Sequence, residues 1–257
     1  MTAGSTAIII PARYGSTRLP AKPLLKLSGK PIIQHVYERA KRARLAGTVV
    51  VATDDSRIAD AVKGFGGEVV ITPANVRSGS DRVAIAVGEM PGVDIVVNLQ
   101  GDEPLIVPRM IDEVIELLQG DPGVRVGTLI RKIENPEDVI NASVVKAVAD
   151  PDGWAIYFSR SPIPHYRAGP EGPSAIRRIY YKHIGLYAYR RDFLLEFSTW
   201  PPSRLEEIEQ LEQLRMIEKG IRIKTRITQY DSIPVDTPED IDRVRTLLRE
   251  KSSVDVE

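Results

Sequence analysis

Short apolar runs alternate with amphipathic segments along the first half of the chain. The runs are rich in β-branched residues, which is typical of buried strands, and the segments between them carry apolar residues at helical spacing. The predicted strands cover residues 7–10, 48–55, 68–72, 94–100 and 124–133, and the predicted helices cover residues 31–43, 55–66, 81–90 and 108–119. This alternation predicts an α/β fold of the Rossmann-like, doubly wound type with a mostly parallel sheet.

The pattern changes after residue 141. Residues 143–164 read as a hairpin that turns at Asp150–Gly153, and a Gly- and Pro-rich loop over 162–173 is expected to be mobile. The remaining predicted elements are strands at 179–191 and 221–228 and helices at 191–200, 203–220 and from Pro238 onward. In the 203–220 helix, Ser203 is the expected N-cap and Glu206 its capping-box partner. We expect one domain over 1–257 with a small hairpin and loop subdomain.

Composition narrows the function classes. Of the 257 residues, 42% are hydrophobic and 27% are charged, as in soluble globular proteins. The 35 Lys and Arg residues balance the 35 Asp and Glu residues, so no overall field favours a nucleic acid or an anionic membrane as partner. The absence of cysteine excludes disulfides, thiolate metal sites and a cysteine nucleophile. The apolar run before Pro11 is short for a signal peptide, so a cytoplasmic location is expected.

A cationic loop follows the first predicted strand. Its positive side chains are Arg13, Arg18 and Lys22, and Gly15, Ser16 and Thr17 offer backbone N–H groups. Loops at the carboxyl ends of strands bind the ligands of α/β sheets, so this loop predicts a polyphosphate site. The sequence is neither a P-loop nor GxGxxG. The alternative is that each arginine simply faces water.

Aspartates at the ends of predicted elements are the candidate metal ligands. Asp102 follows a buried strand, and Pro104 and Pro108 delay the next helix, so its carboxylate has no helix to cap there. Mg²⁺ bridging phosphate oxygens is a natural partner, and an ordinary turn aspartate is the alternative. At Asp54–Asp55 a helix cap is favoured over a metal site. At Asp150–Asp152 a hairpin turn is favoured over the DxD metal motif of glycosyltransferases.

The chain resembles the sugar nucleotidyltransferases, and among them the CMP-Kdo synthetases. The resemblance spans essentially the whole chain and rests on PARYGSTRLPAKPL, SGSDR, QGDEP, YFSRSPIP, KHIGLYAYR, WPPSRLEEIEQLEQLR and VDTPED. It implies transfer of CMP from CTP to the anomeric hydroxyl of 3-deoxy-D-manno-octulosonate (Kdo) for lipopolysaccharide synthesis, with Mg²⁺ as cofactor. It also implies a homodimer, with residues 154–190 as the sugar-binding and dimerisation region. The Arg167–Arg177 loop is a place where such families vary in length.

The resemblance also assigns roles to individual residues. The implied catalytic residues are Arg13, Lys22, Asp102 and Asp236, of which Asp102 and Asp236 would hold Mg²⁺. The implied nucleotide-binding residues are Arg13, Arg18, Lys22, Arg77, Ser78, Gly79, Gln100 and Asp102. The implied sugar-binding residues are Gln100, Arg160, His183, Tyr187, Glu212 and Gln213.

Several of these residues have plainer interpretations. Asp236 lies in DTPED, which is also a helix N-cap signature. His183 suits a structural group between strand residues. Glu212 and Gln213 suit a solvated helix face beside an apolar stripe that comprises Ile208, Leu211 and Leu214. The rival functions are a cytidylyltransferase for 8-amino-Kdo or sialic acid, a metal-dependent glycosyltransferase, and a nucleotide-binding protein without turnover.

Overall fold

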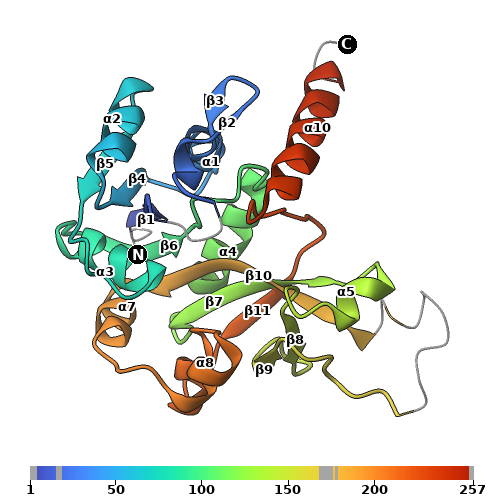
Figure 1. Cartoon of the computed structure of the whole chain (residues 1–257). Helices are drawn as coiled ribbons and strands as arrows, with labels where there is room; N and C mark the ends of the chain where they lie inside the picture. The colour runs from blue at the N-terminus through green and yellow to red at the C-terminus, as the bar shows by residue number, and fades with distance from the viewer. Residues whose placement is uncertain (1–4, 16–18, 168–175, 177–178, 255–257) are drawn as a thin grey trace. The chain divides into compact units, whose positions relative to one another are not determined.

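The computed structural model describes residues 5–15, 19–167, 176 and 179–254, with side chains up to residue 248 (Figure 1). The chain divides into two compact units. The first consists of Met1–Asp112 and Asp231–Glu257, and the second of Glu113–Tyr230. Within the described residues, no helix has the length and apolar character needed to cross a membrane.

A four-stranded parallel arrangement forms the centre of the first unit. Its strands are β1 (Ser5–Ala12), β4 (Thr48–Thr53), β5 (Glu68–Ile71) and β6 (Val93–Asn98), in the order β6-β1-β4-β5. Its helices are α1 (Ile32–Ala40), α2 (Ser56–Gly64), α3 (Gly79–Gly88) and α10 (Pro238–Val254), and α4 (Pro108–Gly120) spans the unit boundary. Side chains of the central strand β1, such as Ile9, are fully buried. The predicted α/β class with a mostly parallel sheet is therefore confirmed.

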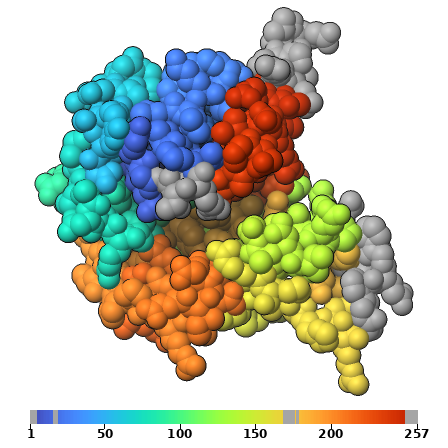
Figure 2. Space-filling model, in the orientation of Figure 1, coloured from blue at the N-terminus to red at the C-terminus, as the bar shows by residue number. Residues whose placement is uncertain are grey.

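A short hairpin that the hydrophobic pattern did not predict lies between β1 and α1. The 3-10 turn η1 (Lys22–Leu24) leads into β2 (Lys26–Leu27) and β3 (Lys30–Pro31). Ser28 and Gly29 make the turn with positive φ angles of 49° and 89°. Helix α10 packs beside β2, and Figure 2 shows its red surface against the blue surface of the first part of the chain.

The expected end of the first strand at Pro11 is wrong. Strand β1 continues through Pro11, which pairs with Ala52 of β4. The pairing of β1 with β6 ends earlier, at Ile9 opposite Asn98. Pro11 therefore has a neighbouring strand on one side only, so its missing N–H removes no hydrogen bond toward β6.

Side chains cap two helix starts in the first unit, and the cap at Asp55 is the predicted one. The Asp55 carboxylate accepts a hydrogen bond of 2.9 Å from the backbone N–H of Arg57 at the start of α2. The Ser78 hydroxyl accepts one of 3.1 Å from the N–H of Asp81 in α3. Local capping therefore decides where these helices begin.

The second unit combines parallel and antiparallel strands. Its strands are β7 (Val126–Lys132), β8 (Lys146–Ala149), β9 (Ala155–Ser159), β10 (Tyr181–Arg190) and β11 (Lys224–Ile227). Strand β7 pairs antiparallel with β10 and parallel with β11, while β8 pairs antiparallel with β9 and β10. The helices are α5 (Pro136–Ile140), α7 (Arg191–Ser198), α8 (Arg204–Glu209) and α9 (Leu214–Glu218). The predicted hairpin is β8–β9, and most of the predicted Arg167–Arg177 loop lies outside the described residues.

The predicted single helix over 203–220 is wrong. The structure has two short helices, α8 and α9, and Gln210 between them adopts a left-handed conformation with φ of 52°. The Glu209 carboxylate accepts hydrogen bonds of 2.6 Å from the Ser159 hydroxyl and 2.9 Å from the Arg160 N–H. These contacts with the end of β9 hold Glu209 in place and outweigh the local tendency to continue the helix. The predicted capping box of Ser203 and Glu206 is confirmed.

Candidate functional site

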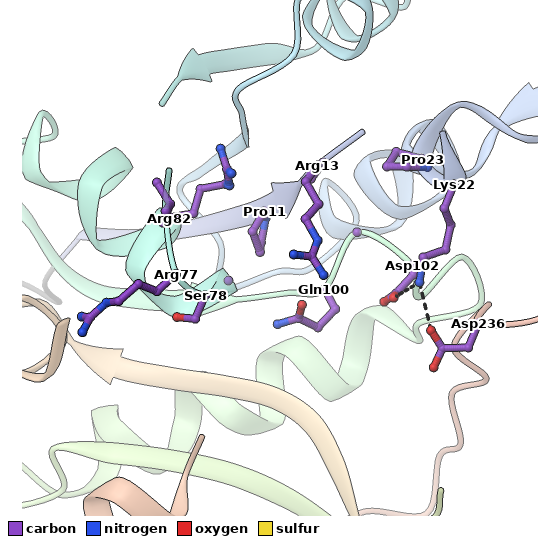
Figure 3. Close-up of a pocket in the computed structure, with 14 residues that line it drawn as sticks. Pro11, Arg13, Lys22, Pro23, Arg77, Ser78, Arg82, Gln100, Asp102 and Asp236 are labelled. Carbon is purple, nitrogen blue, oxygen red and sulfur yellow. Dashed lines mark hydrogen bonds and ion pairs between the residues drawn. The ribbon is translucent and has the colours of Figure 1, made fainter. Parts of the chain in front are cut away.

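A polar cavity of about 300 Å³ lies in the first unit, where β1 and β6 end (Figure 3). Its lining comprises Pro11, Ala12, Arg13, Lys22, Pro23, Val76, Arg77, Ser78, Gly79, Arg82, Gln100, Gly101, Asp102 and Asp236. Most of the nucleotide-site residues expected from the sequence are in this set. Arg18 lies outside the described residues.

Lys22, Asp102 and Asp236 form the charged end of the cavity. The Lys22 ammonium donates to Asp102 Oδ2 at 2.6 Å and to Asp236 Oδ1 at 3.0 Å. Although burial by itself lowers the pKa of Lys22, the two carboxylates outweigh burial and raise this pKa above 10.5. Because both carboxylates contact one ammonium, residues far apart in the sequence lie side by side.

The carboxylate of Asp236 is not the cap of α10. Thr237 is the N-cap, and Asp240 is its capping-box partner, because the Asp240 carboxylate accepts hydrogen bonds from the N–H groups of Asp236 and Thr237 at 3.0 and 2.9 Å. The Thr237 hydroxyl in turn accepts a long bond of 3.4 Å from the Asp240 N–H. The cap in DTPED therefore belongs to Thr237 and Asp240, while the Asp236 carboxylate contacts Lys22.

The turn that carries Asp102 packs tightly against β1. A Cβ atom on Gly101 would lie 2.9 Å from the carbonyl oxygen of Pro11, closer than real Cβ contacts, so only glycine fits there without a shift. Beside it, burial and then the charge of Asp102 raise the pKa of Glu103 to about 7. The Glu103 carboxylate accepts a hydrogen bond from the Ser232 hydroxyl.

The opposite end of the cavity is built on the start of α3. Figure 3 shows Arg77 and Ser78 at the far side of the cavity from Lys22. Arg77 forms an ion pair of 2.8 Å with Asp81, and Gln100 donates to the Asn98 side chain at 3.0 Å. These groups offer a guanidinium and an amide to a polar ligand.

Arg82 is a cavity residue that sequence reasoning did not select. Its side chain is 5% exposed and forms an ion pair of 3.3 Å with Asp54, and its guanidinium also donates to the Thr72 hydroxyl. The only signal in the sequence was its place at the end of SGSDR. The cap of α2 is therefore Asp55, whereas Asp54 is the ion-pair partner of Arg82.

Three proposed sugar ligands lie close together in the second unit. The His183 ring centroid is 5.3 Å from that of Tyr187, and His183 Nε2 is 3.1 Å from the Thr128 hydroxyl. Burial lowers the pKa of His183 to about 3, so its imidazole is neutral at physiological pH. Burial, then Tyr189 and the nearby charge of Glu212, raise the pKa of Tyr187. The group therefore presents neutral polar atoms beside one carboxylate.

Glu212 and Gln213 lie in the turn before α9, and the burial expected around them is wrong. Ile208 is 66% exposed instead of buried, whereas Gln213 is 6% exposed instead of solvated. Because Gln210 between α8 and α9 is left-handed, the side chains of the two helices do not share the single buried face that one continuous helix would have. Among the described residues, the Gln213 side-chain nitrogen is buried and has no hydrogen-bond partner. Glu212 forms a long ion pair of 3.7 Å with Arg215.

Arg160 is held by the backbone around it. Its guanidinium donates to the carbonyl oxygens of Glu209, Ala142 and Gln210 at 2.8, 3.0 and 3.3 Å. In this arrangement the guanidinium braces the turn between α8 and α9. A role for Arg160 in binding the sugar stays a prediction.

The DxD sequence at the hairpin turn acts as a turn. Asp150 accepts a hydrogen bond of 2.7 Å from the Trp154 N–H and forms an ion pair of 3.3 Å with Arg222. Within the described residues, no group of three or more His, Asp or Glu side chains has the arrangement of a metal site. The Asp102 and Asp236 pair nevertheless offers the hard oxygen donors that Mg²⁺ uses with substrate phosphates.

Comparisons with known proteins agree with the resemblance found in the motifs. Residues 7–223 match the family model described as cytidylyltransferase. A 3-deoxy-manno-octulosonate cytidylyltransferase of Geobacter sulfurreducens is 52% identical over 246 residues, covering 94% of this chain and 98% of the relative. Another, from Desulfatibacillum aliphaticivorans, is 52% identical and covers 95% and 98%.

A solved structure extends the agreement to three dimensions. It is CMP:2-keto-3-deoxy-manno-octonic acid synthetase complexed with CTP, with a TM-score of 0.89 and 44% identity, covering 96% of this chain and 99% of that one. Sequence, motifs and architecture therefore coincide over nearly the whole length. The chain belongs to the cytidylyltransferase family and, within it, to the 3-deoxy-manno-octulosonate cytidylyltransferases.

Proposed function

We propose that this chain transfers CMP from CTP to the anomeric hydroxyl of Kdo and releases pyrophosphate. The observation that carries the proposal is the cavity in which Lys22, Asp102 and Asp236 meet at one end and Arg77 and Ser78 lie at the other. A cavity of about 300 Å³ is at the lower end of the range for ligand sites. The relatives named for this reaction support the choice of CTP and Kdo.

The reaction demands alignment and charge neutralisation. The sugar oxygen forms a bond to the α-phosphorus, the bond from that phosphorus to the β-phosphate oxygen breaks, and the hydroxyl proton leaves. Lys22 and Arg13 bring positive charge to the triphosphate in this proposal. Ser78 and Gly79 at the start of α3 approach the nucleoside, and Gln100 contacts nucleotide and sugar. Holding both reactants in line supplies much of the acceleration.

We propose Mg²⁺ as the cofactor, held by Asp102 and Asp236. Two carboxylates together with phosphate oxygens and water make the donor set that this ion prefers. When bound, Mg²⁺ supplies charge neutralisation at the phosphates and Lewis acidity that favours loss of the hydroxyl proton. Lys22 then moves its positive charge from the two carboxylates toward the triphosphate.

The acid sugar is assigned to residues of the second unit. His183, Tyr187 and Glu212 are grouped there, and Gln213 has an amide nitrogen still able to donate. Kdo carries several hydroxyls, which neutral imidazole, phenol and amide groups can bind in a directional way. Arg160 is the proposed partner of the sugar carboxylate.

The test is release of pyrophosphate from CTP with Kdo, measured with and without Mg²⁺. We expect turnover only when CTP, Kdo and Mg²⁺ are all present, and loss of turnover in Asp102→Asn. Faster pyrophosphate release with 8-amino-Kdo or sialic acid than with Kdo would show that the proposed sugar substrate is wrong. Binding of CTP with no turnover on any of these sugars would favour a nucleotide-binding protein. Turnover retained in Asp152→Ala would count against a metal-dependent glycosyltransferase.

We also propose that the protein is a homodimer of the cytoplasm, where its donor CTP is made. Ile156 and Tyr166, within residues 154–190, are large hydrophobic side chains that are 57% and 40% exposed, as at a subunit interface. Sedimentation should give a dimer that Ile156→Asp converts to monomer. The matched control is Ile71→Asp, because Ile71 is 62% exposed in the first unit. A wild-type monomer would contradict the proposal.

A further inference from the structure

The segment that carries Asp236 has no regular secondary structure. Residues 228–237 form neither helix nor strand before α10 begins at Pro238. Because no ladder of backbone bonds sets the position of this segment, the place of Asp236 depends on individual hydrogen bonds. Asp236 is also one of the two proposed metal ligands, so a shift in this segment would separate the pair.

Two hydrogen bonds join this segment to the turn after β6. The Val235 N–H donates to the Asp102 carbonyl oxygen at 2.9 Å. The Ser232 hydroxyl donates to the Glu103 carboxylate, and Ser232 is 8% exposed. The two bonds start from neighbouring residues of the turn, Asp102 and Glu103, and reach residues three apart in the segment.

The turn itself is a firm support for these bonds. Gly101 packs against β1 so closely that a Cβ would lie 2.9 Å from the Pro11 carbonyl oxygen. The Glu103 carbonyl oxygen accepts a hydrogen bond of 3.0 Å from the Ile106 N–H. The backbone of Glu103 is therefore held next to β1. Through its hydrogen bond with the Glu103 carboxylate, Ser232 is attached to this fixed turn.

We propose that Glu103 is a positioning residue, which holds residues 231–236 through Ser232 so that the Asp236 carboxylate stays beside Asp102 and Lys22. The inference rests on the proposed function, because it assigns Glu103 to the support of the proposed metal site. Glu103 acts here through the segment, and it binds neither the nucleotide nor the metal. Groups that orient metal ligands commonly change metal affinity by about 10- to 100-fold when they are removed.

The first measurement is Mn²⁺ affinity in the presence of CTP, by titration calorimetry on the full chain without Kdo. Ser232→Ala and Glu103→Ala should each weaken Mn²⁺ binding by about 10- to 100-fold, and the double variant no further. Glu103→Gln should stay close to wild type, because its amide oxygen still accepts the Ser232 hydroxyl. Ser198→Ala is the matched control, since that hydroxyl donates to the Leu195 carbonyl oxygen inside α7.

The second measurement is hydrogen exchange in the metal-free protein. Ser232→Ala should speed the exchange of the Val235 amide and of its neighbours in 231–236, while exchange in α3 stays as in wild type. This measurement reports directly on the Ser232–Glu103 hydrogen bond and needs neither metal nor substrate. If Glu103→Ala fails to fold, Ser232→Ala and Glu103→Gln decide the question.

Three results would overturn the inference. One is that Glu103→Gln loses as much Mn²⁺ affinity as Glu103→Ala while Ser232→Ala binds normally, because Glu103 would then act at the metal. Another is a lower melting temperature with unchanged Mn²⁺ affinity, which is a purely structural effect. The third is a wild type that does not bind Mn²⁺ with CTP. A wild type that binds Mn²⁺ and CTP without releasing pyrophosphate from any acid sugar would instead refute the proposed function alone.

Discussion

Replacing Lys22 by methionine tests whether its ammonium holds two carboxylates together. Methionine keeps a long unbranched side chain and removes the positive charge. In the structure the Lys22 Nζ is 2.6 Å from Asp102 Oδ2 and 3.0 Å from Asp236 Oδ1, and the Lys22 side chain is 13% exposed. The variant therefore removes the ammonium that both carboxylates contact and leaves their two negative charges side by side.

The size of the effect follows from the charges and their exposure. Two unit charges about 4 Å apart interact by about 4 kcal/mol at an effective dielectric constant of about 20. The side chains of Asp102 and Asp236 are 27% and 35% exposed, so water and salt weaken this interaction. We expect Lys22→Met to lower the free energy of unfolding by about 1–2 kcal/mol at low salt. Added Mg²⁺ should restore most of this loss, because it replaces the missing positive charge.

The assay is urea unfolding at low ionic strength, with and without Mg²⁺, together with pyrophosphate release. Lys26→Met is the matched control, because Lys26 is an exposed lysine on β2. We expect Lys26→Met to behave as wild type in both assays and Lys22→Met to lose turnover even when Mg²⁺ restores its stability. A Lys22→Met protein as stable as wild type and indifferent to Mg²⁺ would refute the reasoning.

Three further predictions concern other residues. Burial lowers the pKa of His183 to about 3, so at pH values below about 6.5 the unfolded chain binds more protons than the folded chain. The free energy of unfolding should therefore fall between about pH 7.5 and pH 5.5, and it should fall less in His183→Gln. Equal pH dependence of the two proteins in urea unfolding would contradict this. Gly101→Ala should lower both stability and turnover, because the added Cβ would lie 2.9 Å from a backbone oxygen of β1. Gly120→Ala is the control: its Cβ would meet nothing within 4 Å, so it should be neutral in both assays. Arg215→Met should lower the free energy of unfolding by about 2–3 kcal/mol, because it removes the guanidinium 2.5 Å from the half-buried Glu206 carboxylate. A loss below about 1 kcal/mol on urea unfolding would disprove this.

The local features of this protein could be predicted from its sequence. Apolar runs such as 48–53 form strands because their side chains must leave water, and caps such as Asp55 and Ser78 lie within three residues of the N–H groups that they bind. The hairpin turn at Asp150 has the same local origin. The family resemblance, which also rests on short motifs, is confirmed by the comparisons. The roles of single site residues stay predictions.

Only the tertiary structure decided which side chains meet and which interpretation of a motif holds. Lys22 reaches Asp102 and Asp236 across 80 and 214 positions of sequence, and no local pattern records such a contact. The start of α10 is capped by Thr237 and Asp240 together, and not by Asp236. The predicted 203–220 helix broke because Glu209 binds the end of β9, a distant strand. Local propensities are worth tenths of a kcal/mol per residue, so a few hydrogen bonds from far along the chain can override them.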